Sequence, residues 1–291
     1  MPRHRQGRST PAISGIGGWE WSDHTPPGID LQPPALTSTL EPDWGHNDRG
    51  QKGFQLLQQK WSEVPLTSQH RALSQDLAQM ADEELHGLWS QCWEEQATGH
   101  NFDVRGWYYT LYRDQWRGKR IIDIGSGLGY DAITFAGAGA AEVMCVDLAP
   151  MNLEVIRRIA TVRGLHNVRT QYIEDFGSLV QLDAYYDVIW ACGSLINSPF
   201  AFTRAECQEL LQHLNPGGRW VELGYPRTRW EREGRMPFDS WGEKTDGGAP
   251  WMEWKDLDKL LQLLAPRRFE VVLTLEFHNS DFNWFDLLAV D

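Results

Sequence analysis

Residues 121–130 read Ile121-Ile-Asp-Ile-Gly-Ser-Gly-Leu-Gly-Tyr130, and this stretch decides the fold. An apolar run of strand-forming residues leads directly into a loop with three glycines, and a helical pattern follows. Glycine lets the backbone turn sharply and approach a ligand without a clash from Cβ. The stretch therefore predicts a buried strand, a ligand-binding loop and a helix, although a tight turn that binds nothing would also fit.

The spacing of the three glycines separates the possible nucleotide cofactors. A dinucleotide fingerprint places its third small residue one position after Gly129, and that position holds the bulky Tyr130. The loop therefore disfavours NAD and FAD. A carboxylate ends the next apolar run, where Asp147 would stand beside the loop and accept hydrogen bonds from both ribose hydroxyls.

Strand and helix patterns alternate through the middle of the chain. The predicted strands are 120–124, 142–146, 168–173, 187–191 and 219–223, and the predicted helices are 130–138, 151–163 and 203–214. This alternation predicts a mainly parallel sheet with helices on both faces. A helix over 254–264 then precedes two strands, 269–277 and 283–290, whose short connection requires antiparallel pairing.

These motifs, in this order, resemble those of the class I S-adenosylmethionine-dependent methyltransferases. The matching segments are Ile121-Ile-Asp-Ile-Gly-Ser-Gly-Leu-Gly129, Val146-Asp147, Glu174-Asp-Phe176, Tyr186-Asp-Val-Ile189 and Leu214-Asn-Pro-Gly-Gly218. The resemblance covers about residues 100–291. It implies an α/β fold whose doubly wound, seven-stranded sheet is mainly parallel with an antiparallel last strand. It also implies S-adenosylmethionine as the cofactor and methyl transfer as the reaction.

The resemblance further implies which residues hold the cofactor. From its methionine portion through the ribose to the adenine, they are Asp123, Gly125, Ser126, Gly127, Asp147, Leu148, Asp175 and Phe176. Cys192 and Gly193 follow the fourth strand and are expected beside the sulfonium. Upstream, Arg105, Trp107 or Tyr108 is expected to cover the cofactor or to bind its carboxylate, as a guanidinium can.

Ligands of an open α/β sheet bind beyond the carboxyl ends of the parallel strands, so the acceptor is expected there. A hydroxyl acceptor needs a base, and His278 between the last two strands is the first candidate, with Asp281 to orient it. A solvated histidine in a hairpin turn is the alternative. Glu222 is the second candidate, because a carboxylate within an apolar strand needs a partner or a ligand. His100 and His46 are weaker candidates.

The segment 224–253 mixes indoles, carboxylates and glycines, and it emerges on the ligand side of the predicted sheet. Such a mixture suits a polyhydroxylated or cationic acceptor, although an exposed insertion without a role would look the same. The residues expected to contact the acceptor are Tyr108, Asn197, Tyr225, Trp241 and Trp251. The 15 tryptophans of the chain either line such a pocket or fill the core.

The net charge of −13 argues against nucleic acid as the substrate, because phosphate-backbone binding depends on clustered Lys and Arg. No segment has the length of a membrane-spanning helix, and His and acidic residues show no metal-ligand spacing. Four cysteines without a Cys-x-x-Cys pair favour reduced thiols in a cytoplasmic protein. The expected partner is a small-molecule acceptor, without nucleic acid or membrane, and the expected state is a monomer or homodimer.

Two parts are predicted. Residues 1–100 form an N-terminal arm and helical cap, and residues 101–291 form the S-adenosylmethionine-binding core, with the insertion named above on the substrate side. The first 50 residues are rich in Gly, Pro, Ser and Thr, which is typical of an irregular arm. Apolar residues at helical spacing over 66–97 predict one or two cap helices, with Thr67 or Ser68 as the N-cap.

The leading functional hypothesis is an O-methyltransferase that acts on a sugar or another hydroxylated metabolite. An N-methyltransferase is the close alternative, because a neutral amine needs no strong base. A catalytically silent binding module with the same fold and a nicotinamide-dependent oxidoreductase are the alternatives from other classes.

Overall fold

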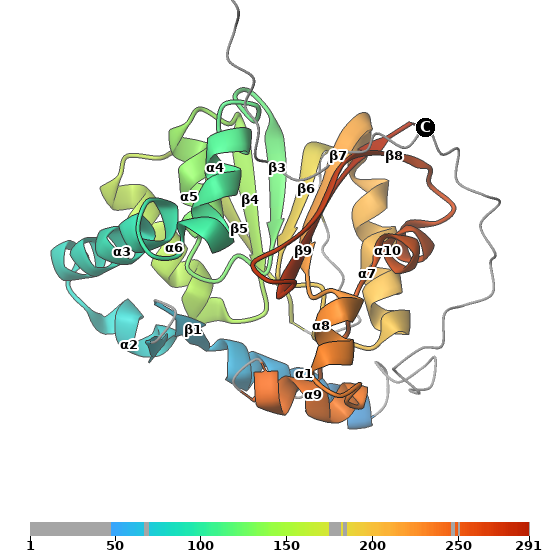
Figure 1. The fold of residues 1–291 in the computed structure, drawn as a ribbon. Helices are drawn as coiled ribbons and strands as arrows, with labels where there is room; N and C mark the ends of the chain where they lie inside the picture. Colours follow the sequence, from blue (N-terminus) through green and yellow to red (C-terminus); the bar gives the residue numbers. More distant parts are fainter. Residues whose placement is uncertain are drawn as a thin grey trace, which may run out of the picture. The chain divides into compact units, whose positions relative to one another are not determined.

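A computed structural model describes the chain over residues 48–66, 70–174, 182, 185–245, 248–249 and 251–290. Within this part, seven strands form one sheet in the order β5-β4-β3-β6-β7-β9-β8 (Figure 1). Their bounds are, in that order, Val168–Tyr172, Glu142–Asp147, Arg120–Ile124, Tyr186–Cys192, Leu214–Gly224, Phe282–Ala289 and Phe269–Phe277. Strand β9 is antiparallel to both of its neighbours, and the other adjacent pairs are parallel. The predicted doubly wound sheet with an antiparallel last strand is confirmed.

Helices cover both faces of this sheet (Figure 1). Those on one face are α4 (Trp107–Tyr112), α5 (Tyr130–Gly137) and α6 (Pro150–Val162), and those on the other are α7 (Phe200–Gln212) and α10 (Leu257–Leu264). Side chains alternate between the faces along each strand, as the two-residue period requires. In β6, Trp190 enters the core under α4 and α5, and its neighbour Ile189 enters the core under α7 and α10. Burial on both faces explains why the central strands are apolar throughout.

Many of the tryptophans belong to these cores. The fully buried ones are Trp89, Trp190, Trp220, Trp241 and Trp284. Trp190 and Trp284 meet edge-on with 5.2 Å between their ring centroids, and Tyr108 stacks on Trp284 at 4.8 Å. Such edge-on and offset contacts are the favoured geometries of aromatic pairs. Trp190, Trp220 and Trp284 therefore fill the cores on the two faces of the sheet, whereas Trp89 and Trp241 fill two separate apolar clusters.

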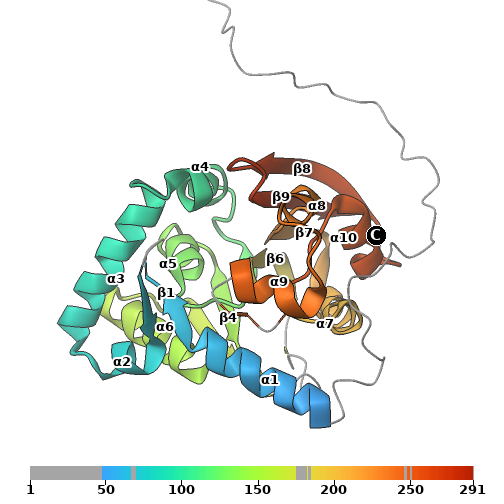
Figure 2. The same ribbon diagram turned by 60° about the horizontal axis from the view of Figure 1, so that its bottom comes forward.

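The elements that precede the sheet are short and local. They are the helix α1 (Asp48–Trp61), the strands β1 (Glu63–Pro65) and β2 (Arg71–Leu73), the helices α2 (Ser74–Gln79) and α3 (Asp82–Ala97), and a π-helical turn, η2 (Phe102–Gly106). Strands β1 and β2 pair antiparallel and form a small separate ladder. Figure 2 shows α1 and β1 crossing beneath the sheet and α3 lying outside α5 and α6.

The structure differs from the sequence prediction at two points in this region. Helix α1 occupies a segment for which the sequence predicts no helix. The predicted cap helices are α2 and α3, and the first begins at Ser74 with Leu73 at its N-cap, whereas the predicted N-caps Thr67 and Ser68 lie outside the described residues. The reason is pairing: residues 71–73 are held as a strand against β1, so a helix cannot include them.

Helix α3 forms an outer layer that holds the start of α5 in place. The indole of Trp89 donates to the Leu128 carbonyl at 2.8 Å, and that of Trp93 donates to Thr134 Oγ1 at 2.8 Å. The Trp89 ring also packs against Tyr130, with 5.2 Å between centroids. These contacts fix the backbone directly after the glycine loop.

The predicted insertion forms helices α8 (Arg227–Arg232) and α9 (Phe238–Thr245), which lie with α1 beyond one end of the sheet (Figure 1). Helix α10 begins three residues later than predicted, because Asp256 caps it by accepting a hydrogen bond from the Lys259 amide at 2.8 Å. Among the described residues, no helix is both long and apolar enough to cross a membrane.

Candidate functional site

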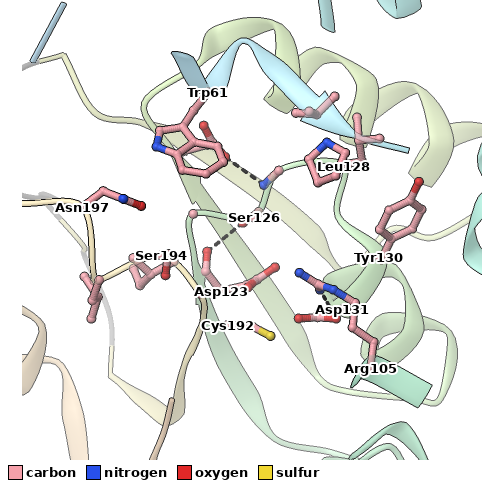
Figure 3. Close-up of a pocket in the computed structure, with 18 of the residues that line it drawn as sticks. Trp61, Arg105, Asp123, Ser126, Leu128, Tyr130, Asp131, Cys192, Ser194 and Asn197 are labelled. Carbon is pink, nitrogen blue, oxygen red and sulfur yellow. Dashed lines mark hydrogen bonds and ion pairs between the residues drawn. The ribbon is translucent and has the colours of Figure 1, made fainter. Parts of the chain in front are cut away.

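A cavity of about 570 Å³ lies at the carboxyl ends of β3, β4 and β6. Ligand sites are expected at this edge of an open α/β sheet, and the volume lies within the usual range for ligand pockets, about 300–1,000 Å³. Its walls come from the glycine loop, the segment 192–198 after β6, helices α1 and α7, and the β8–β9 turn. Figure 3 shows part of this wall, with Trp61 over the loop and Asn197 on the side opposite Arg105.

The glycines of the loop are required by its geometry. Gly125, Gly127 and Gly129 all have positive φ, at +66°, +53° and +70°. A Cβ on Gly125 would lie 2.4 Å from Cβ of Ser194, and one on Gly129 would lie 2.7 Å from Cγ1 of Ile156. The first glycine therefore lets the loop approach the segment after β6, and the last lets α5 pack closely on α6.

Asp147 ties β4 to the glycine loop. Its Oδ2 accepts from the Gly127 amide at 2.8 Å, and its Oδ1 accepts from the Ala149 amide at 2.8 Å and from Asn152 Nδ2 at 3.2 Å. Burial raises the pKa of Asp147 to about 6, although these hydrogen bonds favour the ionised form. The carboxylate lines the cavity, and its Oδ2 accepts only one of these three hydrogen bonds, so it can also accept one from a ligand.

Asp123 is a second buried carboxylate in the wall. Only 2% of the residue is exposed, and its Oδ2 has no hydrogen-bond partner among the described residues. Burial, followed by the charge of Asp131, raises the pKa of Asp123 well above its ordinary value. A buried oxygen without a donor is costly, so a ligand that donates to Asp123 from the cavity would complete the site.

Asp131 joins the wall, although the sequence did not single it out. Its Oδ1 accepts from the hydroxyls of Tyr109 at 2.5 Å and Tyr108 at 3.1 Å, and its Oδ2 accepts from the Trp190 indole at 2.8 Å. The Arg105 guanidinium lies 3.5 Å from Oδ1, and Figure 3 shows the two side chains facing each other. An acid in the first turn of a helix usually serves the helix end, so only the fold reveals that this one turns inward.

Of the site residues predicted over 105–108, before the glycine loop in the sequence, one lines the cavity and two lie in the core. Arg105 lines the cavity. Trp107 does not, because its ring packs edge-on against Tyr108, Phe277 and Trp284. Tyr108 is fully buried behind the wall, where its hydroxyl contacts Asp131, so its predicted contact with the acceptor is not supported.

The segment after β6 supplies another part of the wall. Cys192, Gly193 and Asn197 all line the cavity, as predicted for a ligand-binding edge. Burial raises the pKa of Cys192 to about 12, so its thiol stays protonated near pH 7 and is not a nucleophile. Asn197 Nδ2 donates to the Trp251 carbonyl at 2.7 Å, which places Trp251 behind Asn197 rather than in the wall.

His278 lies in the turn between β8 and β9 and lines the cavity. Its Nδ1 is 3.0 Å from Asp103 Oδ2, whereas its Nε2 is 4.0 Å from Asp281 Oδ2. Asp281 also lines the cavity and forms an ion pair with Arg232. Asp103, which the sequence did not suggest, is therefore the closer partner of the imidazole, in place of Asp281.

Three other predicted residues do not line the cavity. Glu222 is 1% exposed and forms an ion pair with Lys255, and it also accepts from the Trp220 indole at 2.9 Å. The partner that its burial requires is thus a lysine rather than a ligand. Tyr225 and Trp241 pack in a separate apolar cluster, with 6.2 Å between their ring centroids.

Of the remaining predicted site residues, some line the cavity and others are not described by the structure. Asp175, Phe176 and His46 lie outside the described residues. His100 lines the cavity. Leu148, Ser126 and the two first loop glycines line it as predicted.

Helix α1 provides a wall that the sequence prediction missed. Phe54, Leu57 and Trp61 line the cavity from this helix. Their spacing of three and four residues places them on one face, and that spacing was a usable signal in the sequence. Gln58 Nε2 donates to the Leu148 carbonyl at 3.0 Å, and the Trp61 carbonyl accepts from Asn152 at 3.1 Å. These bonds fasten α1 to the end of β4.

Comparison with known proteins identifies the central part of the chain. Residues 121–218 match the family model described as a methyltransferase domain. The chain is 32% identical over 118 residues to a mitochondrial ubiquinone biosynthesis O-methyltransferase of Schizosaccharomyces pombe, covering 40% of this chain and 41% of that protein. It is 36% identical over 110 residues to a demethylmenaquinone methyltransferase of Thermus thermophilus, covering 37% and 48%.

Other matches extend the range of acceptors among similar proteins. A ribosomal protein L11 methyltransferase of Symbiobacterium thermophilum is 28% identical over 125 residues, with 43% of this chain and 38% of that protein covered. A solved structure from Nostoc punctiforme, described as an O-methyltransferase candidate, is 14% identical with a TM-score of 0.51, and the match covers 68% of this chain and 60% of that one. That structural likeness shows the fold. The chain spans less than half the length of the three curated relatives named here.

Residues 121–218 therefore form a class I S-adenosylmethionine-dependent methyltransferase domain. The cavity fits this cofactor on two observations. Gly125 and Gly127 present bare backbone, and a Cβ at Gly125 would close the approach to Ser194. Asp123 holds a buried oxygen that needs a donor, which the ammonium group of the cofactor's methionine portion can supply.

Proposed function

We propose that this protein transfers the methyl group of S-adenosylmethionine to a hydroxyl of a small molecule. One observation carries the proposal: the glycine loop of the methyltransferase domain lines one part of a single cavity. Beyond Cys192, the same cavity is lined by polar and aromatic side chains that no cofactor contact explains. A continuous cavity allows a bound acceptor to meet the reactive methyl group.

The cofactor end of the cavity runs from Asp123 to Asp147. We place the methionine ammonium at Asp123, the ribose hydroxyls at Asp147, and the adenine between Leu148 and Trp61. The polar contacts use carboxylates whose burial makes each hydrogen bond strong. Arg105, already beside Asp131, lies where it can meet the carboxylate of the methionine portion.

The acceptor end is formed by Asn197, Ser198, Phe202, Phe282 and their neighbours. Helix α1 lines the cavity and is bonded to the end of β4 by Gln58, which favours a small molecule over a folded protein or nucleic acid. The net charge of −13 supports the same choice.

When bound, S-adenosylmethionine supplies a methyl group activated by a positively charged sulfur. The protein then has to align the acceptor oxygen with that methyl group, exclude water and remove the hydroxyl proton. Phe54, Leu57 and Phe202 provide an apolar wall that excludes water. His278, the base favoured by the sequence, lies at this end, but 35% of its side chain is exposed and its Nδ1 faces Asp103.

An amine acceptor is the second candidate. The observation in its favour is the number of acidic side chains at the acceptor end, namely Asp103, Glu206 and Asp281. Carboxylates would attract an ammonium group before it loses its proton.

The test has two stages. Calorimetric titration with S-adenosylmethionine is expected to show one site, and the absence of binding would favour a catalytically silent module. A panel of sugars, phenols and amines is then tested for release of S-adenosylhomocysteine. Release with hydroxyl compounds supports the proposal, whereas release with amines alone would replace it by N-methylation.

A further inference from the structure

Glu206 is a charged residue on α7 that faces the cavity. Phe202 lies one helical turn before it, and both line the cavity. Thr203, Cys207 and Leu210 occupy the adjacent face of the helix and are buried in the core. A period of 3.6 residues produces this division, which places an acid on the wall of the acceptor end.

The carboxylate of Glu206 forms no hydrogen bond or ion pair with any described residue. Glu206 is half-buried, and the fully buried acids of this part of the fold differ from it in having a cationic partner. Glu222 is paired with Lys255, and Glu253 accepts from Lys259 Nζ at 2.5 Å. An unpaired carboxylate that is half-buried in the wall of a cavity is accessible to a ligand there, and a ligand that displaces the cavity water would have to supply its partner.

The surrounding charges leave Glu206 without a counterion of its own. Lys255 is the cation that lowers its pKa most, but Lys255 is already bound to Glu222, whose charge acts in the opposite direction. Burial is the largest influence, and it raises the pKa of Glu206 to about 7. Such a carboxylate exchanges a proton readily at neutral pH.

The other charged groups in this part of the wall are engaged elsewhere. Arg229 pairs with Glu233 at 3.0 Å and lies over the Tyr225 ring at 4.4 Å. His278 faces Asp103, which is itself on the wall. Asp281 is paired with Arg232. Each of these groups therefore has a charged side chain as its partner, which Glu206 lacks among the described residues.

The position of α7 relative to the segment after β6 is fixed. Ser198 Oγ and Thr203 Oγ1 are 2.8 Å apart, and the Thr203 amide donates to the Pro199 carbonyl at 3.0 Å. Because Ser198 lines the cavity, this contact holds Glu206 on a rigid element beside the segment that leads from the cofactor end.

We propose that Glu206 is the general base of the methyl transfer, which rests on the function proposed above. The acceptor O–H bond breaks as its proton passes to the Glu206 carboxylate, and the oxygen forms a bond to the methyl carbon. The bond between that carbon and sulfur breaks, and its electron pair stays on sulfur, which becomes a neutral thioether. The proton on Glu206 then returns to solvent.

Glu206→Gln is the main test, with His278→Gln as the matched control. General-base removal is expected to lower kcat by about 100-fold or more, with the affinity for S-adenosylhomocysteine unchanged by calorimetry. His278→Gln is expected to lose less than about tenfold. A kcat for Glu206→Gln within about threefold of wild type, or a larger loss for His278→Gln, would overturn the proposal.

Two further measurements separate a base from a structural residue. The kcat of the wild type is expected to rise with pH through about 7, because the carboxylate must be ionised, and Glu206→Gln removes this step. Glu206→Asp should restore part of the rate.

An infrared difference spectrum, wild type minus Glu206→Gln, needs no acceptor. It should show a carboxyl that titrates near pH 7, and titration near the ordinary value of glutamate would overturn the proposal. If S-adenosylhomocysteine does not bind the wild type, the proposed function fails instead.

Discussion

The two ends of the cavity are built in different ways. At the cofactor end, the polar groups come from the ends of adjacent strands, and Asp147 is satisfied largely by backbone amides within a few residues of the loop. At the acceptor end, the wall is assembled from α1, the segment after β6, α7 and the β8–β9 turn, which lie far apart in the sequence. The cofactor end is therefore formed by neighbouring strand ends, whereas the acceptor end forms only when distant segments of the chain pack together.

This difference predicts which substitutions should change cofactor binding and which should change turnover. The cofactor end is held by short-range bonds, so its residues are expected to control binding and local structure together. The acceptor end contains a carboxylate, Glu206, that has no partner in the part of the chain that the structure describes, so substitution there is expected to change turnover and leave the fold intact. The predictions that follow test this division, beginning with the largest effect.

Gly125→Ala is expected to weaken S-adenosylhomocysteine binding about 100-fold or more, which corresponds to about 2.7 kcal/mol. The new Cβ would lie 2.4 Å from Ser194 and would occupy a φ of +66°. Gly118→Ala is the matched control, because Gly118 has a φ of +73° but nothing within 4 Å of its Cβ. Calorimetry should show normal binding for the control. Equal losses of affinity in both variants would show that the close approach of Gly125 to Ser194 is not the cause.

Asp147→Ala is expected to weaken cofactor affinity by at least about tenfold, since it removes the acceptor that we propose for the ribose hydroxyls and a bond to the Gly127 amide. Asp147→Asn keeps one acceptor oxygen and should lose less. Unchanged affinity in the alanine variant would show that the ribose lies elsewhere.

The same carboxylate predicts a pH dependence of cofactor binding. Burial raises the pKa of Asp147 to about 6, and the ribose hydroxyls would bind its ionised form more tightly. Affinity is therefore expected to fall as the pH is lowered through about 6. Calorimetry on either side of that pH checks this, and Asp147→Asn should flatten the profile. A wild-type profile that is flat would contradict the assignment.

The contrast between the two ends also explains what the sequence could predict. Strand-terminal acids and a glycine loop follow one another in the chain, so Asp123, Gly125 and Asp147 could be placed on the cavity wall from their order alone. The same holds for the sheet, because apolar strands alternate with amphipathic helices. A sequence pattern predicts these features because each of them is formed by residues that are close together in the chain.

The errors arise where the outcome depends on distant contacts. Glu222 looked unpaired because Lys255 lies 33 positions away in the sequence. Trp241 was predicted to contact the acceptor because its bond to Glu233 forms only when α8 and α9 fold together. Glu206 was missed for the opposite reason. An acid on an amphipathic helix is normally solvated, and nothing in the sequence shows that α7 turns this one toward a cavity.

His278→Ala is expected to reduce turnover by a few fold and to leave cofactor affinity within about twofold of wild type. Its ring lies at the cavity mouth, 3.0 Å from Asp103, where it can help position the acceptor. Asp103→Ala should reproduce most of the loss, because it removes the partner of Nδ1. Steady-state kinetics with an acceptor from the panel measures both variants, and a normal rate for His278→Ala would return this residue to a solvated turn.

Trp241→Phe is expected to have the smallest effect on catalysis and thus tests the boundary of the acceptor end. Trp241 is 1% exposed, packs against Tyr225 and donates to Glu233 at 2.6 Å, but it does not line the cavity. The acceptor KM should stay within about twofold, while the loss of the hydrogen bond and of ring volume should lower the free energy of unfolding by about 1–3 kcal/mol. Thermal or urea unfolding measures the second quantity. If KM rises strongly at unchanged stability, Trp241 contacts the acceptor after all, and the acceptor end must extend into the cluster formed by α8 and α9.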